Sequence, residues 1–244
     1  MMRSQLGGTI LWLTGWSMSN KVFDRLRGLL PDFHHVSVEY SAAASSEEML
    51  HLTETAAKSL RSSCSGPLLI GGWSLGGLLA LKLADQKLAD GLILFSATAR
   101  FTRPKEQQNR GWADAYVRQM ITGLQRDRQA VERKFRQMIF TPLEAASEPG
   151  NHHSLIGNWT TPALIAGLET LRHVECLSRL PAIHCPVLLI HGTEDQICPY
   201  EAAEELLMQL SQAKLLAIPD SGHAPFVGRE ALIAESIRSW WHDQ

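Results

Sequence analysis

Residues 67–84 read PLLIGGWSLGGLLALKLA, an apolar run that passes through a glycine-bearing turn into a segment with helical spacing. The turn is Gly72-Trp73-Ser74-Leu75-Gly76, with a glycine two residues on either side of the serine. In such a strand-to-helix turn the serine hydroxyl stands out over a sheet, and larger residues in place of the glycines would collide. Ser74 is therefore the candidate nucleophile, between a buried strand and a helix.

Short apolar runs recur on both sides of this turn, and segments with apolar residues at helical spacing separate them. The runs are residues 9–14, 35–40, 67–72, 91–96, 186–192 and 214–218, and the helical segments are residues 20–30, 47–61, 75–84, 201–210 and 229–241. Continuous apolar runs that alternate with helices are typical of a mostly parallel sheet covered on both faces. The predicted fold class is therefore α/β.

Between residues 97 and 184 this alternation stops. The segment is charged and helix-prone, and a turn-rich stretch at residues 141–157 interrupts it. We interpret residues 97–184 as a helical cap inserted into a core formed by residues 1–96 and 185–244. Within the cap, residues 100–138 hold ten basic and four acidic residues, a local charge of +6, whereas the rest of the chain carries −8.

A serine hydroxyl is a weak nucleophile at neutral pH, so the chain must also supply a histidine base and a carboxylate that orients it. Asp195 follows the run 186–192, where residues at the carboxyl end of a parallel strand gather around an active site. Its neighbour Glu194 is the alternative, and a surface turn is the non-catalytic interpretation. His223 stands in DSGHAPF, residues 220–226, on a loop after the last strand. We assign His223 as the general base and Asp195 as the acid.

The negative oxygen of a tetrahedral intermediate needs backbone N–H donors. One candidate is the N–H of Leu75, directly after the nucleophile. The loop after the first strand, TGWSM at residues 14–18, offers the N–H of Trp16 as the second donor. This chemistry uses no metal and no cofactor, and we expect neither. We interpret the pair His152-His153 as part of a polar loop.

The composition is that of an ordinary globular protein. The chain of 244 residues has 45% hydrophobic and 20% charged residues and a formal net charge of -2, which does not fit a disordered or nucleic-acid-binding chain. The apolar run at residues 10–13 is too short for a signal-peptide core or a membrane span. The four cysteines form no zinc or disulfide pattern. We therefore expect a cytoplasmic protein without membrane or nucleic-acid partners.

Taken together, these motifs in the order Ser, Asp, His resemble the α/β-hydrolase superfamily over essentially the whole chain. Within it, Thr14-Gly15-Trp16, the tryptophan-containing turn at Ser74 and His223-Ala224-Pro225-Phe226 are similar to the pimeloyl-[acyl-carrier-protein] methyl ester esterases of biotin synthesis. The resemblance implies a serine carboxylesterase that removes a methyl group from a pimeloyl chain carried on acyl carrier protein. Many superfamily members have His-Gly where this chain has Thr14-Gly15.

The resemblance also implies roles for the cap. In the related esterases, cap arginines contact the acidic carrier protein, which a local charge of +6 would attract. The arginines in the comparable stretch are Arg126, Arg128, Arg133 and Arg136. Phe135 and Met138 match a cap helix that lines the acyl channel, and Trp16 is a third expected substrate contact. The alternatives are a solvated helix face for the arginines and core positions for Phe135 and Met138.

Three other functions stay open. A general small-ester carboxylesterase, or the menaquinone-pathway lyase that forms succinyl-hydroxycyclohexadiene carboxylate, would use a similar triad on the same fold. A hydrolase-like binding protein without catalysis would use the pocket as a receptor. The presence of Ser74, Asp195 and His223 together argues against this last interpretation.

Overall fold

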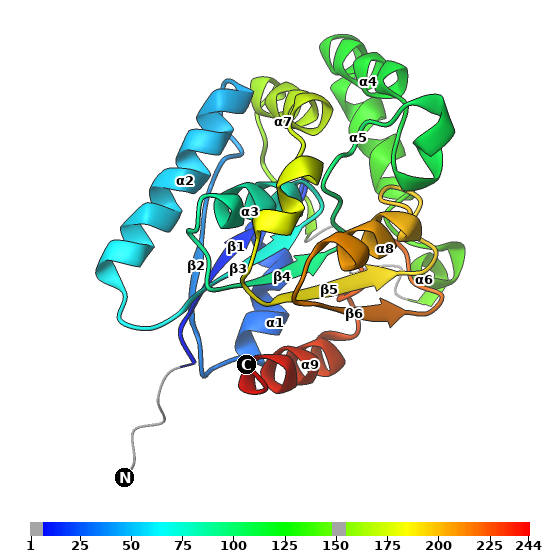
Figure 1. Cartoon of the computed structure of the whole chain (residues 1–244). Helices are drawn as coiled ribbons and strands as arrows, with labels where there is room; N and C mark the ends of the chain where they lie inside the picture. Colours follow the sequence, from blue (N-terminus) through cyan, green and yellow to red (C-terminus); the bar gives the residue numbers. More distant parts are fainter. Residues whose placement is uncertain (1–6, 148–154) are drawn as a thin grey trace.

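A parallel β-sheet of six strands runs through the computed structural model, which describes residues 7–147 and 155–244 (Figure 1). The strands are β1 (Thr9–Leu13), β2 (His34–Ser37), β3 (Leu68–Trp73), β4 (Gly91–Phe95), β5 (Val187–Gly192) and β6 (Ala213–Ile218). Their order across the sheet is β2-β1-β3-β4-β5-β6, and every neighbouring pair is parallel. The α/β class and the six predicted apolar runs are thus confirmed, although β2 ends at Ser37 rather than at residue 40.

The inner strands are apolar on both faces because both faces are covered. Every residue of β1, β3, β4 and β5 is buried, whereas most of β2 and β6 at the two edges is only half-buried. The register sets Leu13 opposite Gly72 and Trp73 opposite Phe95. The carboxyl ends of β1, β3 and β4 therefore reach the same edge of the sheet, and the residues that follow them are neighbours.

Two helical layers enclose the sheet. Helices α1 (Asp24–Gly28) and α9 (Glu230–His242) cover one face, and α2 (Ser46–Ser63), α3 (Leu75–Asp85) and α8 (Tyr200–Gln209) cover the other (Figure 1). The helix predicted at residues 20–30 is divided into a 3-10 turn, η1 (Asn20–Phe23), and α1. Among the helices of the two described ranges, none combines the length and the apolar character that crossing a membrane requires.

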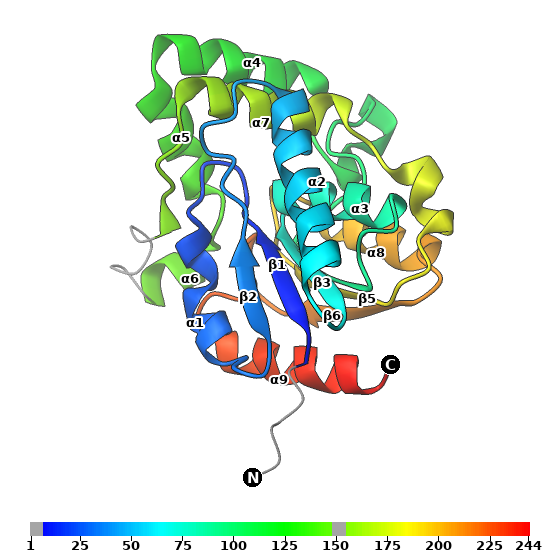
Figure 2. The ribbon, with the colours of Figure 1, turned by 90° about the vertical axis from the view of Figure 1, so that its left-hand side faces the viewer.

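Between β4 and β5 the described chain forms helices and short 3-10 turns. They are η2 (Lys105–Arg110), α4 (Asp114–Arg126), α5 (Arg128–Gln137), α6 (Pro142–Ser147), α7 (Thr161–His173) and η4 (Leu177–Ala182). Figure 2 shows β1 and β2 running toward α4, α5 and α7, which lie beyond the carboxyl ends of these strands. We call residues 97–184 the cap; its division from a core of residues 1–96 and 185–244 stays a prediction. His152-His153 lies outside the described residues.

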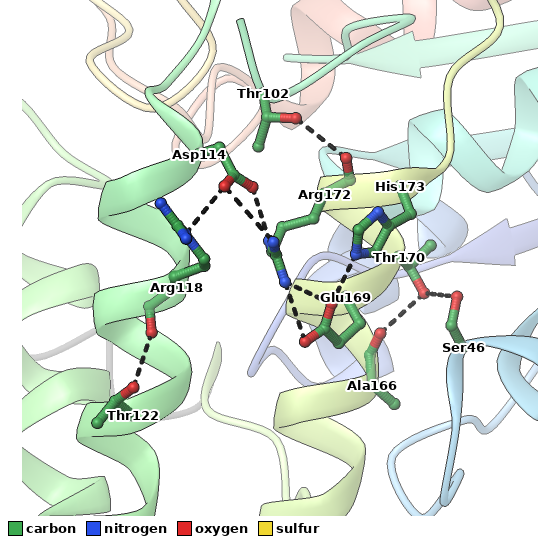
Figure 3. Close-up of polar contacts among 10 residues, drawn as sticks. All are labelled: Ser46, Thr102, Asp114, Arg118, Thr122, Ala166, Glu169, Thr170, Arg172 and His173. Atoms are coloured by element: carbon green, nitrogen blue, oxygen red, sulfur yellow. Dashed lines mark hydrogen bonds and ion pairs between the residues drawn. The ribbon is translucent and has the colours of Figure 1, made fainter.

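Polar contacts link α4, α7 and α2 (Figure 3). Nε of Arg172 in α7 donates to Asp114 of α4 at 2.7 Å, and Nη1 of the same arginine donates to Glu169 at 2.9 Å. The hydroxyls of Ser46, at the start of α2, and Thr170 lie 2.8 Å apart. Helix α7 thus connects the rest of the cap to one of the layers that cover the sheet.

A buried ion pair fixes the chain where it leaves the sheet for the cap. The Arg103 side chain is 1% exposed, and its two terminal nitrogens donate to the two carboxylate oxygens of Glu205 in α8. Arg110 reaches the same carboxylate at 3.0 Å. Removal of one member of such a pair typically costs about 3–5 kcal/mol, because a buried charge is left unpaired. The first turns of the cap are therefore anchored to α8.

Candidate active site

Ser74 occupies the turn between β3 and α3, as the sequence predicts. Its φ of 57° lies in the left-handed region, which costs a residue other than glycine roughly 1–2 kcal/mol. A Cβ at position 72 would lie 2.4 Å from the carbonyl oxygen of Gly76, and one at position 76 would lie 2.0 Å from that of Leu13. Both glycines are therefore required by the close approach of backbone to backbone.

His223 and Asp195 form a buried, hydrogen-bonded pair. His223 Nδ1 lies 2.8 Å from Asp195 Oδ2 and 3.0 Å from Oδ1. The backbone N–H groups of Ile197 and Cys198 donate to Oδ1 at 2.8 and 2.9 Å and fix the orientation of the carboxylate. Because Nδ1 carries the proton shared with the carboxylate, Nε2 is the basic nitrogen. It is buried and has no hydrogen-bond partner among the described residues, which suits a base that accepts the proton of a serine.

A second histidine contacts the same carboxylate. His191, in β5, has its Nε2 at 2.7 Å from the carbonyl oxygen of Cys198 and at 3.4 Å from Asp195 Oδ2. Burial alone would raise the pKa of Asp195, but the charges and hydrogen bonds of His223 and His191 outweigh burial and hold that pKa well below its ordinary value. Asp195 is therefore ionised. Sequence reasoning missed His191, although its place at the end of an apolar run, four residues before Asp195, was a usable signal.

The thiol of Cys198 lies beside the Ser74 hydroxyl. Burial raises the pKa of this thiol well above its usual value and the charge of Asp195 raises it further, whereas a hydrogen bond with the Ser74 hydroxyl acts the other way. The thiol therefore stays protonated and unreactive. Because the backbone of Cys198 is bonded to Asp195, this contact places Ser74 next to the pair of Asp195 and His223.

The two N–H groups predicted to hold the oxyanion are available. Leu75 begins α3, so its N–H has no acceptor within the helix. Trp16 lies in a turn that the N–H of Met18 closes onto the carbonyl of Gly15 at 3.2 Å, and the N–H of Trp16 donates no backbone hydrogen bond in the described part of the chain. Free N–H groups beside a helix N-terminus favour a negative oxygen.

The loop that carries His223 is held from two sides. The N–H of His223 donates to the carbonyl of Ile139 at 2.7 Å, and Glu144 of α6 accepts the N–H of Gly222 at 3.0 Å. From the other side, Nε1 of Trp73 donates to the carbonyl of His223 at 2.7 Å. The cap and the turn at Ser74 together fix the loop of His223, and sequence reasoning predicted none of these contacts.

Two of the residues expected to touch substrate line a pocket of about 180 Å³ between α4 and α5, namely Phe135 and Met138. The ring of Phe135 meets that of Trp16 edge to face, with 4.9 Å between the ring centroids. Met138 also borders a more open hollow of about 380 Å³ that reaches Gln196, next to Asp195 in the chain. Trp16 of the oxyanion loop thus contacts Phe135 of the cap, and Phe135 and Met138 line the same pocket.

Comparison with known families fits this geometry. A family model described as serine aminopeptidase, S33, matches residues 40–229, a range that includes Ser74, Asp195 and His223. The chain belongs to this α/β-hydrolase family.

Several curated relatives of this hydrolase carry the same name. This hydrolase is 30% identical over 233 residues to the pimeloyl-[acyl-carrier protein] methyl ester esterase of Nitrosomonas europaea, and the match covers 91% of this chain and 90% of the relative. The esterase of that name from Xanthomonas oryzae is 28% identical, with 95% and 94% of the two chains covered. The one from Aromatoleum aromaticum is 33% identical over 64% of this chain and 66% of its own.

Solved structures agree on the fold. An esterase from Exiguobacterium antarcticum superposes with a TM-score of 0.81 at 23% identity and covers 96% of this hydrolase and 92% of that chain. A bromoperoxidase from Bacillus anthracis has a TM-score of 0.81 at 13% identity, with coverage of 96% and 91%. At these identities the likeness concerns the fold alone.

In this hydrolase the four predicted partner-binding arginines form two groups. Arg126 and Arg133 are exposed, and neither has an ion pair in the two described ranges. Arg128 and Arg136 are partly buried and pair with the buried carboxylate of Glu132, at 2.7 and 3.8 Å. The structure therefore leaves the first group free at the surface and engages the second within the cap. In the described ranges, His, Cys, Asp and Glu side chains form no metal-binding group of three or more.

Proposed function

We propose that this hydrolase is a serine carboxylesterase that cleaves the methyl ester of a pimeloyl chain carried on acyl carrier protein. The observation that carries the proposal is the similarity to the Nitrosomonas europaea esterase of that name across nine tenths of both chains. The site supports it independently, because a buried Ser, His and Asp constellation with two free N–H groups is suited to acyl transfer. The cap arginines offer an acidic carrier a docking surface, because Arg126 and Arg133 are exposed and Arg128 and Arg136 are partly exposed beside them.

In the acylation step, the Ser74 hydroxyl attacks the ester carbonyl and His223 Nε2 takes its proton. Asp195 stabilises the imidazolium through Nδ1, and the N–H groups of Trp16 and Leu75 hold the negative oxygen. The protonated histidine then gives its proton to the leaving oxygen, so that methanol departs and an acyl-serine remains.

In the deacylation step, His223 removes a proton from water, which attacks the acyl-serine. The second tetrahedral intermediate collapses with return of the proton to Ser74. The net reaction is ester plus water to carboxylic acid plus methanol. The acyl chain would extend from Trp16 past Phe135 and Met138 to the surface of the cap, where the carrier docks.

The first experiment compares hydrolysis of methyl pimeloyl-carrier protein with that of a free short-chain methyl ester. We expect the wild type to cleave the carrier substrate with the higher kcat/KM and with marked salt sensitivity. Arg126→Glu/Arg133→Glu should raise the KM for the carrier substrate about tenfold at low salt. Turnover of the free ester should not change.

The matched control is Lys58→Glu/Lys87→Glu, which reverses two exposed lysines of the core and should leave both substrates unaffected. Equal or better turnover of the free ester, indifferent to the charge of the cap, would instead indicate a general small-ester carboxylesterase.

Covalent labelling with a fluorophosphonate tests whether Ser74 is a catalytic nucleophile. Wild type should be labelled on Ser74, and Ser74→Ala should lose both labelling and ester hydrolysis. A wild-type protein that is folded but neither labelled nor active would point to a hydrolase-like binding protein.

A further inference from the structure

The turn that presents the Trp16 N–H has an unusual residue at its third position. Ser17 has a φ of 65°, the value typical of the third residue of a type II turn, which glycine or asparagine adopts most readily. Ser17 is also completely buried. A serine in this conformation is strained, and its buried hydroxyl needs a hydrogen-bond partner, because an unpaired polar group in the interior is costly.

That partner is Glu132 of the cap helix α5. The Ser17 hydroxyl donates to Glu132 Oε1 at 2.5 Å, between residues that lie 115 positions apart in the chain. The neighbours of Ser17 are also held by the cap: Nε1 of Trp16 donates to the carbonyl of Leu164 at 2.7 Å, and Met18 forms a β-bridge with Ile156. The oxyanion loop is therefore positioned by residues of the cap.

Two arginines of the cap compensate the negative charge of the Glu132 carboxylate. Glu132 is 7% exposed, and a buried carboxylate needs cationic compensation. Nε of Arg128 donates to Oε2 at 2.7 Å, and Nη1 of Arg136 lies 3.8 Å from Oε1. Both arginine side chains are about one third exposed, at 33% and 29%. One carboxylate thus joins two surface cations to the oxyanion loop.

We propose that Glu132 is a positioning residue that sets the oxyanion loop through Ser17 and transmits the docking of an acidic partner at Arg128 and Arg136 to the rate of ester cleavage. Acidic groups of a docked carrier compete with Glu132 for the two arginines. The Ser17 hydroxyl then becomes the principal donor to the carboxylate, and the turn that holds the Trp16 N–H becomes more rigid. The coupling rests on the proposed function, whereas the positioning does not.

Positioning is tested on a free short-chain ester, which involves no carrier. Ser17→Ala keeps the same Cβ and loses only the hydroxyl, and we expect it to lower kcat about tenfold while KM stays within about twofold. That is less than the roughly 10²–10³-fold loss that follows removal of an oxyanion donor. Glu132→Ala should lower kcat as much as Ser17→Ala does. Glu132→Gln should recover most of the kcat, because its amide oxygen still accepts a hydrogen bond from the Ser17 hydroxyl.

The control is Arg118→Ala, an exposed arginine of α4 that does not contact Glu132; its kcat should equal that of wild type. If Glu132→Ala does not fold, Ser17→Ala and Glu132→Gln still decide the matter. An unchanged kcat in folded Ser17→Ala would overturn the positioning role.

Coupling is tested by the ratio of kcat on the carrier-borne ester to kcat on the same ester attached to free pantetheine. We expect a ratio of several-fold in wild type and a ratio near one in Glu132→Gln, where the charge shared with Arg128 and Arg136 is gone. Equal ratios in the two proteins would overturn the coupling. Failure of the wild type to cleave the carrier ester would overturn the proposed function and the coupling, while the short-ester comparison would still measure positioning.

Discussion

At the scale of single residues, the strain at Ser74 is tolerated because two glycines let backbones meet where other residues could not. The clash at Gly76 is with the carbonyl of Leu13, part of the backbone of the buried strand β1, which is hydrogen-bonded on both sides and cannot move aside. The geometry of the nucleophile thus depends on the absence of a single methyl group.

We expect Gly76→Ala to lower the free energy of unfolding by about 3 kcal/mol or more and to abolish ester hydrolysis, because a Cβ 2.0 Å from a carbonyl oxygen forces β1 and α3 apart. Gly28→Ala is the matched control, since a Cβ at position 28 meets no atom within 4 Å; it should be neutral or stabilising by up to about 1 kcal/mol. Urea unfolding of wild type and both variants measures the midpoints and the free energies of unfolding. Similar midpoints would contradict the prediction.

The identity of the catalytic acid is a second question at this scale. Asp195 is buried against His223, whereas its neighbour Glu194 is exposed. We expect Asp195→Asn to lower kcat by about 10⁴-fold, because an amide cannot hold the imidazole in the productive tautomer. Glu194→Gln should retain wild-type kcat. Steady-state kinetics on a short-chain ester measure both kcat values. A large loss of kcat in Glu194→Gln would indicate that Glu194, and not Asp195, is the acid.

At the scale of elements, α6 shows how the cap supports the histidine loop. Glu144 accepts hydrogen bonds from Thr141, Ser221 and Gly222 and pairs with Arg229. Burial acts to raise the pKa of Glu144, but these donors outweigh it and the pKa lies below its ordinary value. By linkage, a lowered pKa stabilises the folded state above the unfolded-state pKa of about 4.3, and this stabilisation is lost as the pH falls through the folded-state value.

Glu144→Gln should therefore lower the free energy of unfolding by about 1–3 kcal/mol at pH 7, and its difference from wild type should shrink as the pH falls below about 4.3. Glu201→Gln, at an exposed carboxylate of α8, should show almost no difference at either pH. Thermal unfolding at a series of pH values provides the measurement. A difference that grows on acidification would have the wrong sign.

The elements also show which features local sequence can predict. Strands such as β3 and β5 could be recognised because burial on both faces requires an unbroken apolar run. Ser74 and Asp195 could be found because each follows such a strand, and His223 because it lies on the loop after the last apolar run. Contacts of Glu132 and Ile139 with distant loops could not be predicted, since helical spacing shows that a helix has an apolar face but not which loop it meets. The pairing of Arg128 and Arg136 with Glu132 could not be predicted for the same reason, and their role in binding a partner stays a prediction.

At the scale of the whole molecule, the cap and the sheet share one hydrophobic core. Buried residues of the cap, including Val117, Leu124, Phe135 and Leu164, are continuous with the buried strands. We expect a single unfolding transition in urea, with coincident midpoints for tryptophan fluorescence and far-ultraviolet circular dichroism. Two separated transitions would show that the cap folds as an independent unit.

The order of the strands along the chain has a consequence for biosynthesis. Strand β4 ends at Phe95, but its partner β5 begins only at Val187, about 90 residues later, which a ribosome takes roughly 5 to 18 seconds to add. During that interval one edge of an apolar strand has no partner, and the nascent chain presents a surface that chaperones bind. Asp195 and His223 are synthesised later still, so an unfinished chain carries the proposed nucleophile, Ser74, without the proposed base that would activate it.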